Sequence, residues 1–324
     1  MMSSIRATGK MHPDKKHAEF RRNGALLLML LPGLLILLAN NYLPMFGIVM
    51  AFQKIDYKKF AFFGDWVGLD NLNAFFKSTY SSVTARNTLL YNLAFIVLGL
   101  VVGVFFAIML SELKSHMARK TYQTIMFLPY FISWVAVSGI VVGFLGDKYG
   151  VVNRMIRPLF NLAPAKWYSK RDAWPAILVF IHLWKNIGYG SVMYYAAING
   201  IDQEIYEAAA IDGAGKWKQI WTITIPLIRS MMIILTILNI GKIFNTDIGL
   251  FYTVPQLQSH GALTKAVATV DTYVYTNLLS TSNSAVSSVN FAAAAAFLQS
   301  VIGFVLVLVT NAIVRRIDSE YALF

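Results

Sequence analysis

The sequence predicts an all-α, polytopic membrane protein with about six transmembrane helices. Hydrophobic residues make up 57% of the 324 residues and charged residues only 14%, well below the roughly 25% charge of an ordinary soluble domain. Several apolar stretches approach or exceed the roughly 20 residues needed to cross a bilayer. The chain has no cysteine, which excludes a disulfide framework and zinc sites built on thiolates.

The apolar stretches divide the chain into a short tail and one transmembrane domain. Residues 1–23 form a basic tail, and residues 24–324 form the domain. The predicted spans cover residues 24–52, 88–110, 121–145, 175–198, 226–244 and 291–314. A basic tail followed by an apolar run is also the pattern of a signal peptide. No cleavage site of small residues follows the apolar run, so we expect this segment to remain in the protein as the first span.

The distribution of basic residues predicts the orientation. The tail and the loops on its side of the membrane hold 14 of the 28 lysines and arginines, and the longer loops on the other side hold 12. The positive-inside rule therefore favours a cytoplasmic location for both termini. We attribute the net charge of +12 to these loops rather than to nucleic-acid binding.

The external loops contain some predicted structure. Residues 60–76 and 151–160 mix apolar and polar residues at roughly helical spacing, as helices at a membrane interface do. Residues 276–290 are rich in serine and asparagine and predict a flexible or hydrogen-bonding loop.

The segment 202–226 is a polar, alanine-rich interruption between two spans. Asp202 can cap a helix start, and Glu204 places negative charge in the first turn, where the helix dipole favours it. Gly213 suits a helix stop because glycine adopts the left-handed conformation without steric cost. Pro226 is expected to open the next span. The pattern predicts a helix, a glycine turn and a second helix on the membrane surface, either as a docking site for a partner or as an ordinary connector.

At these residues the chain resembles the binding-protein-dependent permease subunits of ABC importers. Their cytoplasmic signature is EAA, three further residues, a glycine, and a proline some thirteen residues later. It stands here as Glu207-Ala208-Ala209, Gly213 and Pro226, with Tyr206, Asp212 and Ala214 also fitting and Ile225 replacing the usual leucine. The similarity covers roughly residues 24–324 and implies a type I importer permease fold with a cytoplasmic coupling helix.

Further segments are similar to the carbohydrate branch of this family, which includes polysaccharide permeases. They are Trp184-Lys185-Asn186-Ile187-Gly188, Tyr194–Ile198 and the ending Arg315–Phe324. Gly68-Leu69-Asp70-Asn71, after span one, is similar to an external element of the family as a whole. Within that branch the resemblance extends to the permease subunit of a bacterial alginate importer. It implies transport of an oligo- or polysaccharide, such as the anionic alginate, from a binding protein into the cytoplasm.

The resemblance also implies partners and a location. A second, different permease, two ATPase subunits at the cytoplasmic face and an extracytoplasmic solute-binding protein would assemble with this chain in the lipid of the bacterial inner membrane. The residues that would dock an ATPase are Glu204, Tyr206, Glu207, Ala208, Ala209, Asp212, Gly213 and Ala214. This chain itself would bind no cofactor, because ATP and Mg²⁺ would be used by the ATPase.

No catalytic apparatus or metal motif is evident in the sequence. Gly213-Ala214-Gly215-Lys216 superficially resembles a phosphate loop, but Ala210 and Trp217 stand where glycine and serine or threonine are required. A membrane enzyme acting on glycans would need clustered carboxylates or histidines, whereas the external carboxylates are scattered. A secondary transporter working without ATP would usually show repeated spans, and no repeat is evident.

Polar and aromatic residues within the spans are candidates for the substrate path, because ionisable groups in a membrane are costly and usually functional. They are His182, Trp184, Lys185, Asn186 and Tyr189 on span four, with Asn239, Lys242, Asn245 and Asp247 near the outer end of span five. We hypothesise that Lys185 and Lys242 contribute positive potential to a cavity that conducts an anionic saccharide. Alternatively, these lysines hold helices together, for example by pairing with Asp247, or extend their ammonium groups to the interface.

Overall fold

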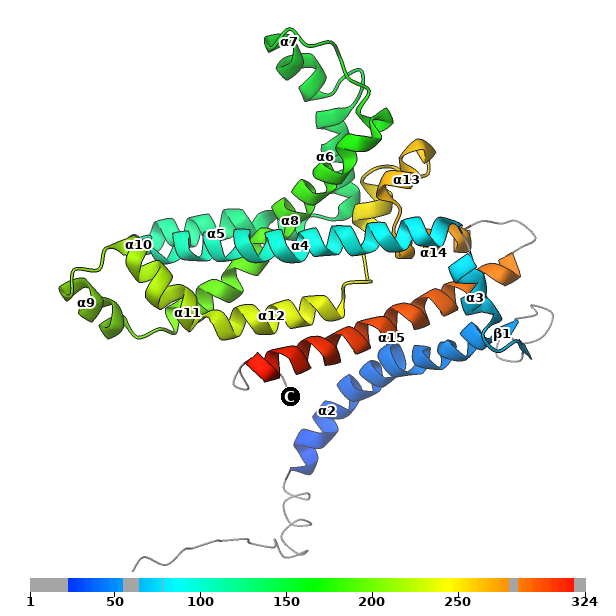
Figure 1. The fold of residues 1–324 in the computed structure, drawn as a ribbon, viewed down its shortest axis with the longest axis horizontal. Coiled ribbons are helices and arrows are strands. Elements are labelled where there is room, and N and C mark those ends of the chain that lie inside the picture. The colour runs from blue at the N-terminus through cyan, green and yellow to red at the C-terminus, as the bar shows by residue number, and fades with distance from the viewer. Residues whose placement is uncertain (1–22, 55–63, 78, 280–284, 318–324) are drawn as a thin grey trace, which may run out of the picture.

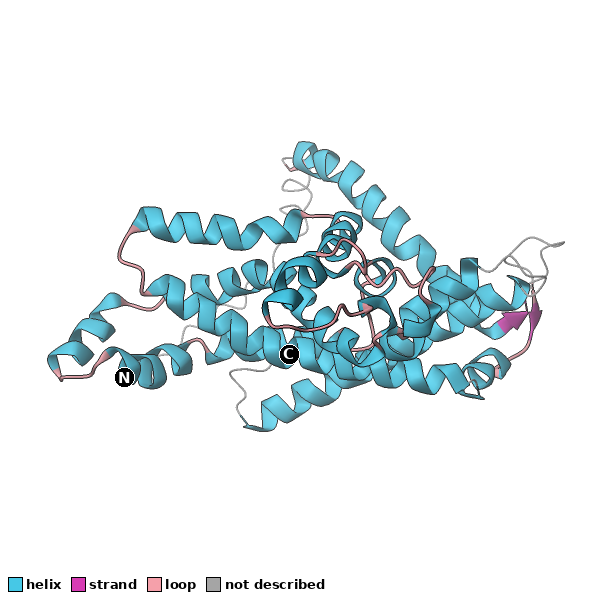
Figure 2. Cartoon of the chain, turned by 90° about the horizontal axis from the view of Figure 1, so that it is seen from above, coloured by secondary structure: helices cyan, strands magenta, loops and turns pink. Residues whose placement is uncertain are grey.

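The computed structural model describes residues 23–54, 64–77, 79–279 and 285–317. Within these ranges the secondary structure is almost entirely helical, as predicted. One short antiparallel pair, β1 (Gln53–Lys54) and β2 (Asp65–Trp66), lies at one end of the molecule (Figure 2). The predicted tail 1–23 lies outside the described residues except for Asn23.

The helical elements follow one another with short connections. In chain order they are α2 (Gly24–Leu37), η1 (Leu38–Tyr42), η2 (Leu43–Phe52), α3 (Asp70–Lys77), α4 (Thr79–Ser111), α5 (His116–Phe131), α6 (Trp134–Leu145), η3 (Val152–Ile156), α7 (Arg157–Leu159), η4 (Trp167–Ser169), η5 (Arg171–Ala173), α8 (Trp174–Asn199), α9 (Gln203–Ile211), α10 (Lys216–Gln219), η6 (Ile220–Thr224), α11 (Ile225–Leu227), α12 (Arg229–Gly241), η7 (Gly249–Thr253), η8 (Gly261–Leu263), α13 (Thr264–Val267), α14 (Val270–Leu279) and α15 (Ala285–Ile317).

The described residues contain four helices long and apolar enough to cross a membrane, or six spans when each of two bent helix pairs counts as one. The four are Leu28–Phe52, Tyr80–Ser111, Arg171–Asn199 and Val289–Arg316. The bent pairs are His116–Phe131 with Trp134–Leu145, at 98°, and Lys216–Leu227 with Arg229–Gly241, at 56°. The six predicted spans are therefore present, but spans three and five are broken rather than continuous.

The break in span three lies at Ile132 and Ser133. Both residues have extended backbone, with ψ of 131° and 151°, so the α-helical hydrogen bonding stops there. The Ser133 hydroxyl accepts a hydrogen bond from the backbone N–H of Ala136 at 3.3 Å and caps α6. Hydropathy did not reveal the break, because the run on both sides of it is apolar.

The start of span five differs from the prediction. The helix that begins at Lys216 continues through Pro226 to Leu227 and bends at Ile228, so Pro226 lies inside a helical segment instead of opening the span. Proline has no backbone N–H to donate, which accounts for a bend close to this position. The span then ends at Gly241, and Lys242 lies just beyond it rather than within it.

The long helices lie side by side in one bundle (Figure 1). Helix α8 packs along α4 and α5, while α15 packs against α12, α14 and η2. The largest fully buried side chains include Trp174, Phe251 and Leu178, which belong to a cluster joining the start of α8 to η7. Only 6% of an apolar 18-residue window within Leu28–Phe52 is buried within the molecule, as suits a helix surrounded by lipid or by another chain.

A lateral arm (residues 134–173) projects from the side of the bundle (Figure 1). It consists of α6, the turns η3 and α7, and the connection to α8. Asn153 holds the arm together: its amide N donates to the Ala165 carbonyl at 2.8 Å, and its amide O accepts from the Ala165 backbone N–H at 3.0 Å. The helical structure predicted for 151–160 is confirmed as two short helical turns.

The other two loop predictions need correction. In place of a helix over 60–76, the structure has α3 from Asp70, and residues 60–63 lie outside the described ranges. Within the flexible or hydrogen-bonding loop predicted over 276–290, α14 continues to Leu279 and α15 starts at Ala285, while residues 280–284 lie outside the described ranges. The preference of serine and asparagine for turns is weak, and tertiary packing can override it. Here α14 and α15 pack against one another.

Candidate functional site

Helix α9 and its following turn form the end of the molecule remote from the β pair (Figure 1). The Asp202 carboxylate accepts the backbone N–H of Glu204 at 3.0 Å, so the predicted cap is present. Gly213 has φ of +77°, and the Ala214 N–H donates to the Ala209 carbonyl at 2.9 Å to close the turn. The predicted helix, glycine turn and second helix are confirmed.

Both helices of this unit expose large apolar side chains. Ile211 is 87% exposed and Trp217 is 75% exposed, on either side of the glycine turn. The carboxylates of Glu204, Glu207 and Asp212 are exposed as well. A cluster of exposed apolar groups beside charged ones is typical of a protein-binding surface.

The unit is braced against the bundle. The hydroxyls of Tyr206 and Thr224 are 3.0 Å apart, which links α9 to the helix that leads into span five. Lys216 forms an ion pair with Glu112 at 2.9 Å. Both side chains of this pair are well exposed, so the pair is worth at most about 1 kcal/mol. Apart from the chain itself, the Tyr206–Thr224 contact is the stronger of these two ties between the unit and the bundle.

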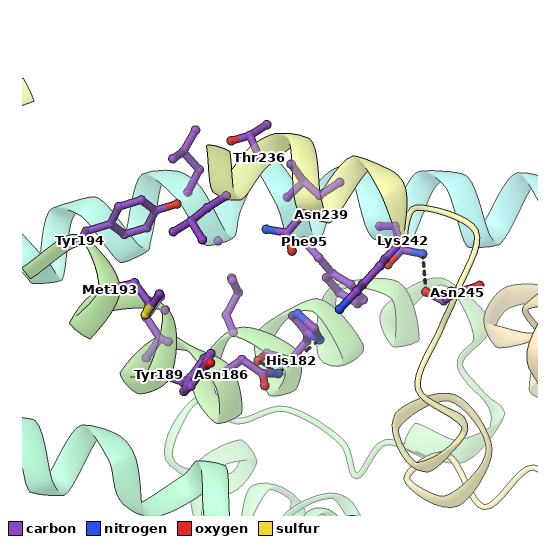
Figure 3. A pocket seen from close by; sticks show the side chains of 18 residues that line it. Phe95, His182, Asn186, Tyr189, Met193, Tyr194, Thr236, Asn239, Lys242 and Asn245 are labelled. Carbon is purple, nitrogen blue, oxygen red and sulfur yellow. Dashed lines mark hydrogen bonds between the residues drawn. The ribbon is translucent and has the colours of Figure 1, made fainter. Parts of the chain in front are cut away.

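A cavity of about 360 Å³ lies between α4, α8 and α12 (Figure 3). Six of the predicted substrate-path residues line it: His182, Asn186, Tyr189, Asn239, Lys242 and Asn245. Other lining residues were not among the predicted ones, chiefly Asn92, Phe95, Met193, Tyr194 and Thr236. Asn92 could have been predicted by the same criterion as the others, because it is a polar residue within an apolar span.

The cavity combines amide groups, aromatic faces and one ammonium. The His182 ring stacks on Phe95 with centroids 3.6 Å apart, and Tyr189 stacks on Tyr130 at 5.1 Å. Among the described lining residues, Lys242 is the one Lys, Arg, Asp or Glu. Amides and aromatic faces suit the hydroxyls and apolar faces of a sugar, and an ammonium without a facing carboxylate suits an anion.

Three predicted substrate-path residues do not line this cavity. Trp184 lines a separate apolar groove of about 620 Å³ between α6 and α8. Asp247 accepts hydrogen bonds from the Trp134 indole at 2.5 Å and the Gly249 N–H at 2.8 Å, and it forms no ion pair with Lys242. Lys185 is 7% exposed and points to the end of α5.

Across the described ranges, no group of three or more histidines and carboxylates is arranged to hold a metal ion.

Comparison with known proteins assigns the family. The profile of the binding-protein-dependent transport system inner membrane component family matches residues 99–321. Protein LplB of Bacillus subtilis is 33% identical over 306 residues, which cover 94% of this chain and 92% of that protein. The chain belongs to this family. The polygalacturonan/rhamnogalacturonan transport system permease protein YteP of B. subtilis is 30% identical, over 91% of this chain and 89% of its own length.

Solved structures in the same transport family share the fold. A chain of a bacterial ABC transporter involved in the import of the acidic polysaccharide alginate superposes with a TM-score of 0.81. The two are 30% identical, and the match covers 94% of this chain and 99% of that chain. A second structure, of a bacterial alginate ABC transporter with an alginate pentasaccharide-bound periplasmic protein, superposes with a TM-score of 0.79.

In the present chain, the loop that follows α12 (residues 242–247) places Lys242 and Asn245 at the cavity. The Asn92 amide donates to the carbonyls of Ile243 at 2.7 Å and Asn245 at 3.1 Å. From the other side, the Asp271 carboxylate accepts the Thr246 N–H at 2.6 Å. The loop is thus held by α4 and α14, which lie far from it in the sequence, and sequence patterns alone give no sign of these contacts.

Proposed function

We propose that this chain is the membrane-spanning permease subunit of an ATP-binding-cassette importer for a carbohydrate. The observation that carries the proposal is the exposed α9 unit, whose apolar and acidic side chains have the form of a docking surface. Family membership and the sugar-transport relatives support it. The chain would act as a conduit rather than as an enzyme.

The energy would come from partner subunits. Two ATPases would bind ATP and Mg²⁺ and receive α9 in a surface cleft, while this chain binds no cofactor. Closure of the ATPases would move α9, and the Tyr206–Thr224 contact would pass the displacement to span five. ATP would then bias the bundle between two packings that open the cavity to opposite sides.

The proposed assembly also contains a second, different permease and an extracytoplasmic solute-binding protein. The α9 end would face the cytoplasm together with both termini, and the opposite end, with α3 and α14, would face the binding protein. The bacterial inner membrane is the expected location. The solved relative with a bound periplasmic protein supports the binding-protein partner in this assembly.

The cargo we propose is an acidic oligo- or polysaccharide, with alginate as the first candidate. Lys242 supplies positive charge to the cavity, and the described lining residues bring no carboxylate to oppose it. Tyr189, whose side chain is about half exposed at 51%, offers a ring surface on which a sugar can stack. The acidic substrates named for YteP and for the alginate transporters are consistent with this choice.

Purification and reconstitution test the proposal. The tagged chain, expressed with its genomic neighbours and extracted in mild detergent, should recover an ATPase and a second permease. Vesicles of this complex should take up alginate oligosaccharides only with ATP and binding protein. Uptake by the chain alone, driven by a proton or sodium gradient, would instead identify a secondary transporter.

A further inference from the structure

Lys185 lies where α8 and α5 approach most closely. A Cβ atom added at Gly188, one turn further along α8, would lie 2.0 Å from the Met126 carbonyl oxygen of α5. The absence of a side chain at Gly188 therefore allows near contact of the two backbones. This approach brings Lys185 to the last turn of α5, at the break in span three.

The ammonium of Lys185 is fully used at this break. It donates to the carbonyl oxygens of Pro129 at 3.1 Å and Tyr130 at 2.8 Å, and also to that of Ile132. An ammonium has three N–H donors, and here three carbonyls accept them. No donor remains for a substrate, in agreement with the position of Lys185 outside the cavity.

The break needs such a cation. The last carbonyls of a helix have no i+4 partner and carry the negative end of the helix dipole; here the Pro129 carbonyl also accepts the Ile132 backbone N–H at 3.2 Å. Within a membrane, unsatisfied carbonyls cost several kcal/mol each, because no water reaches them. In broken helices of other transporters, such carbonyls coordinate Na⁺. In this protein the ammonium group of Lys185 binds the carbonyls in the position that Na⁺ takes in those transporters.

A chain of contacts connects this cation to the cavity. The Lys185 nitrogen lies 5.1 Å from the centroid of the Trp134 ring, in cation–π geometry. The edge of the same indole donates its N–H to the Asp247 carboxylate at 2.5 Å. A Cβ atom at Gly249 would lie 2.2 Å from the Trp134 ring, so the indole is also confined sterically.

We infer that Lys185 is a built-in cation that holds the break of span three at its bend and, through Trp134 and Asp247, positions the loop 242–247 at the cavity. It is a positioning residue rather than a substrate ligand. The part that concerns the cavity rests on the proposed function, whereas the part that concerns the break does not.

Because the chain has no cysteine, two introduced cysteines can carry spin labels without background. Met117→Cys on α5 and Tyr149→Cys beyond α6 replace side chains that are 74% and 79% exposed. Pulsed EPR on the full chain reconstituted in lipid should give one narrow distance. In Lys185→Ala that single distance should be lost, since the freed carbonyls no longer fix the bend.

Added n-propylammonium replaces the missing atoms of Lys185→Ala and should restore the narrow distance. Tetramethylammonium, which has the charge but no N–H group, should not restore it. Lys242→Ala, the matched lysine variant in the cavity, should keep the parent distance. An unchanged distance in folded Lys185→Ala, or equal rescue by both ions, would overturn the inference.

Trp134→Phe tests the connection to the loop. It keeps the ring over Lys185 but removes the N–H that binds Asp247, so we expect faster amide hydrogen exchange in residues 242–247 with the EPR distance unchanged. Unchanged exchange would refute the connection. Lys185→Ala protein that cannot be purified in ordinary buffers should be purified again with n-propylammonium in every buffer. Folded protein obtained only with this ion supports the inference, and the absence of folded protein with it contradicts the inference.

These measurements do not depend on transport. A chain that takes up no sugar but shows the ammonium-specific rescue would contradict the proposed function and leave this inference intact. Normal sugar uptake without the ammonium-specific rescue would support the proposed function and contradict this inference.

Discussion

At the scale of single residues, Lys242 is the group that gives the cavity its charge. Its side chain is exposed in the cavity beyond the end of α12, with no ion pair in the described part of the chain. A charge contact near 4 Å is worth on the order of 1–4 kcal/mol between bulk water and a protein surface. An anionic sugar in contact with Lys242 would gain a stabilisation of this size that a neutral sugar would not.

We therefore expect Lys242→Gln to lower the preference for anionic over neutral oligosaccharide by on the order of 10-fold, since each 1.4 kcal/mol is a factor of ten. Competition uptake in vesicles measures this preference. Lys265→Gln, an exposed lysine on α13 away from the cavity, is the control. Equal preference in Lys242→Gln and the parent would remove Lys242 from the substrate path.

Tyr168 in the lateral arm predicts how the stability of the arm changes at alkaline pH. Burial, with a smaller contribution from the nearby negative charge of Asp147, raises the pKa of Tyr168 from 10.0 to about 12. The unfolded chain ionises this group at lower pH than the folded chain does. The stability it contributes is therefore complete below pH 10 and is lost as the pH rises to about 12.

Tyr168→Phe should remove part of the alkaline loss of stability of the arm. Within the described structure the buried Tyr168 hydroxyl has no hydrogen-bond partner, so the substitution leaves no partner unsatisfied. Limited proteolysis of the arm between pH 9 and 12 measures the effect, and Tyr149→Phe, at a position 79% exposed, is the control. An identical pH profile in Tyr168→Phe and the parent would contradict the prediction.

At the scale of elements, α9 is predicted to bind the ATPase. Glu207→Lys reverses a charge on its exposed surface, and Gly213→Trp puts a β-carbon at a φ of +77°, which costs roughly 1–2 kcal/mol. We expect both variants to lose the ATPase during purification or to hydrolyse ATP without transport. Asp172→Lys, a charge reversal at an exposed site near the start of α8, should behave as the parent. Normal coupled uptake in both α9 variants would exclude this helix as the docking site.

The crossing of α5 and α8 gives a second prediction at this scale. Gly188→Ala places a methyl group 2.0 Å from the Met126 carbonyl, so the helices must separate, at a typical cost of about 1–3 kcal/mol. Gly190→Ala on the same helix meets no atom within 4 Å and should stabilise the chain by about 0.5–1 kcal/mol, because alanine favours the helix over glycine. Thermal unfolding in detergent compares the two. Equal stability of the two variants would show that the close approach is not required.

At the scale of the whole molecule, a polar tie joins three distant segments. The Asp271 carboxylate of α14 accepts the Thr246 N–H at 2.6 Å and the Thr246 hydroxyl at 2.8 Å. The Gln299 amide of α15 donates to Asp271 at 3.2 Å and to the Phe244 carbonyl at 2.6 Å. The tie fixes the loop beyond α12 against the last span.

Asp271→Ala should destabilise the folded chain by on the order of 3 kcal/mol, because hydrogen bonds to a charged group are worth about 1.5–3 kcal/mol and their donors would be left unpaired. The measurement is thermal or denaturant unfolding in detergent, with Asp172→Ala as the exposed control. A loss no greater than in the control would show that the tie contributes little.

Local properties of the sequence predicted much of this protein. Span number follows from hydropathy over about 20 residues, and the α9 unit follows from Asp202 and Gly213, whose capping acts within a few residues of each. Six of the substrate-path candidates line the cavity, and they were selected because a polar or aromatic side chain in or next to an apolar span is conspicuous.

Tertiary structure alone decided the rest. The bend in span three depends on Lys185, which is 53 to 56 positions from the carbonyls it binds, and the loop at the cavity depends on Asn92, Asp271 and Gln299. Lys185 and Lys242 have the same chemistry in the sequence, yet one fills a helix end and the other faces the cavity. Their difference arises from packing between distant segments, because only the folded backbone determines which acceptors surround each ammonium.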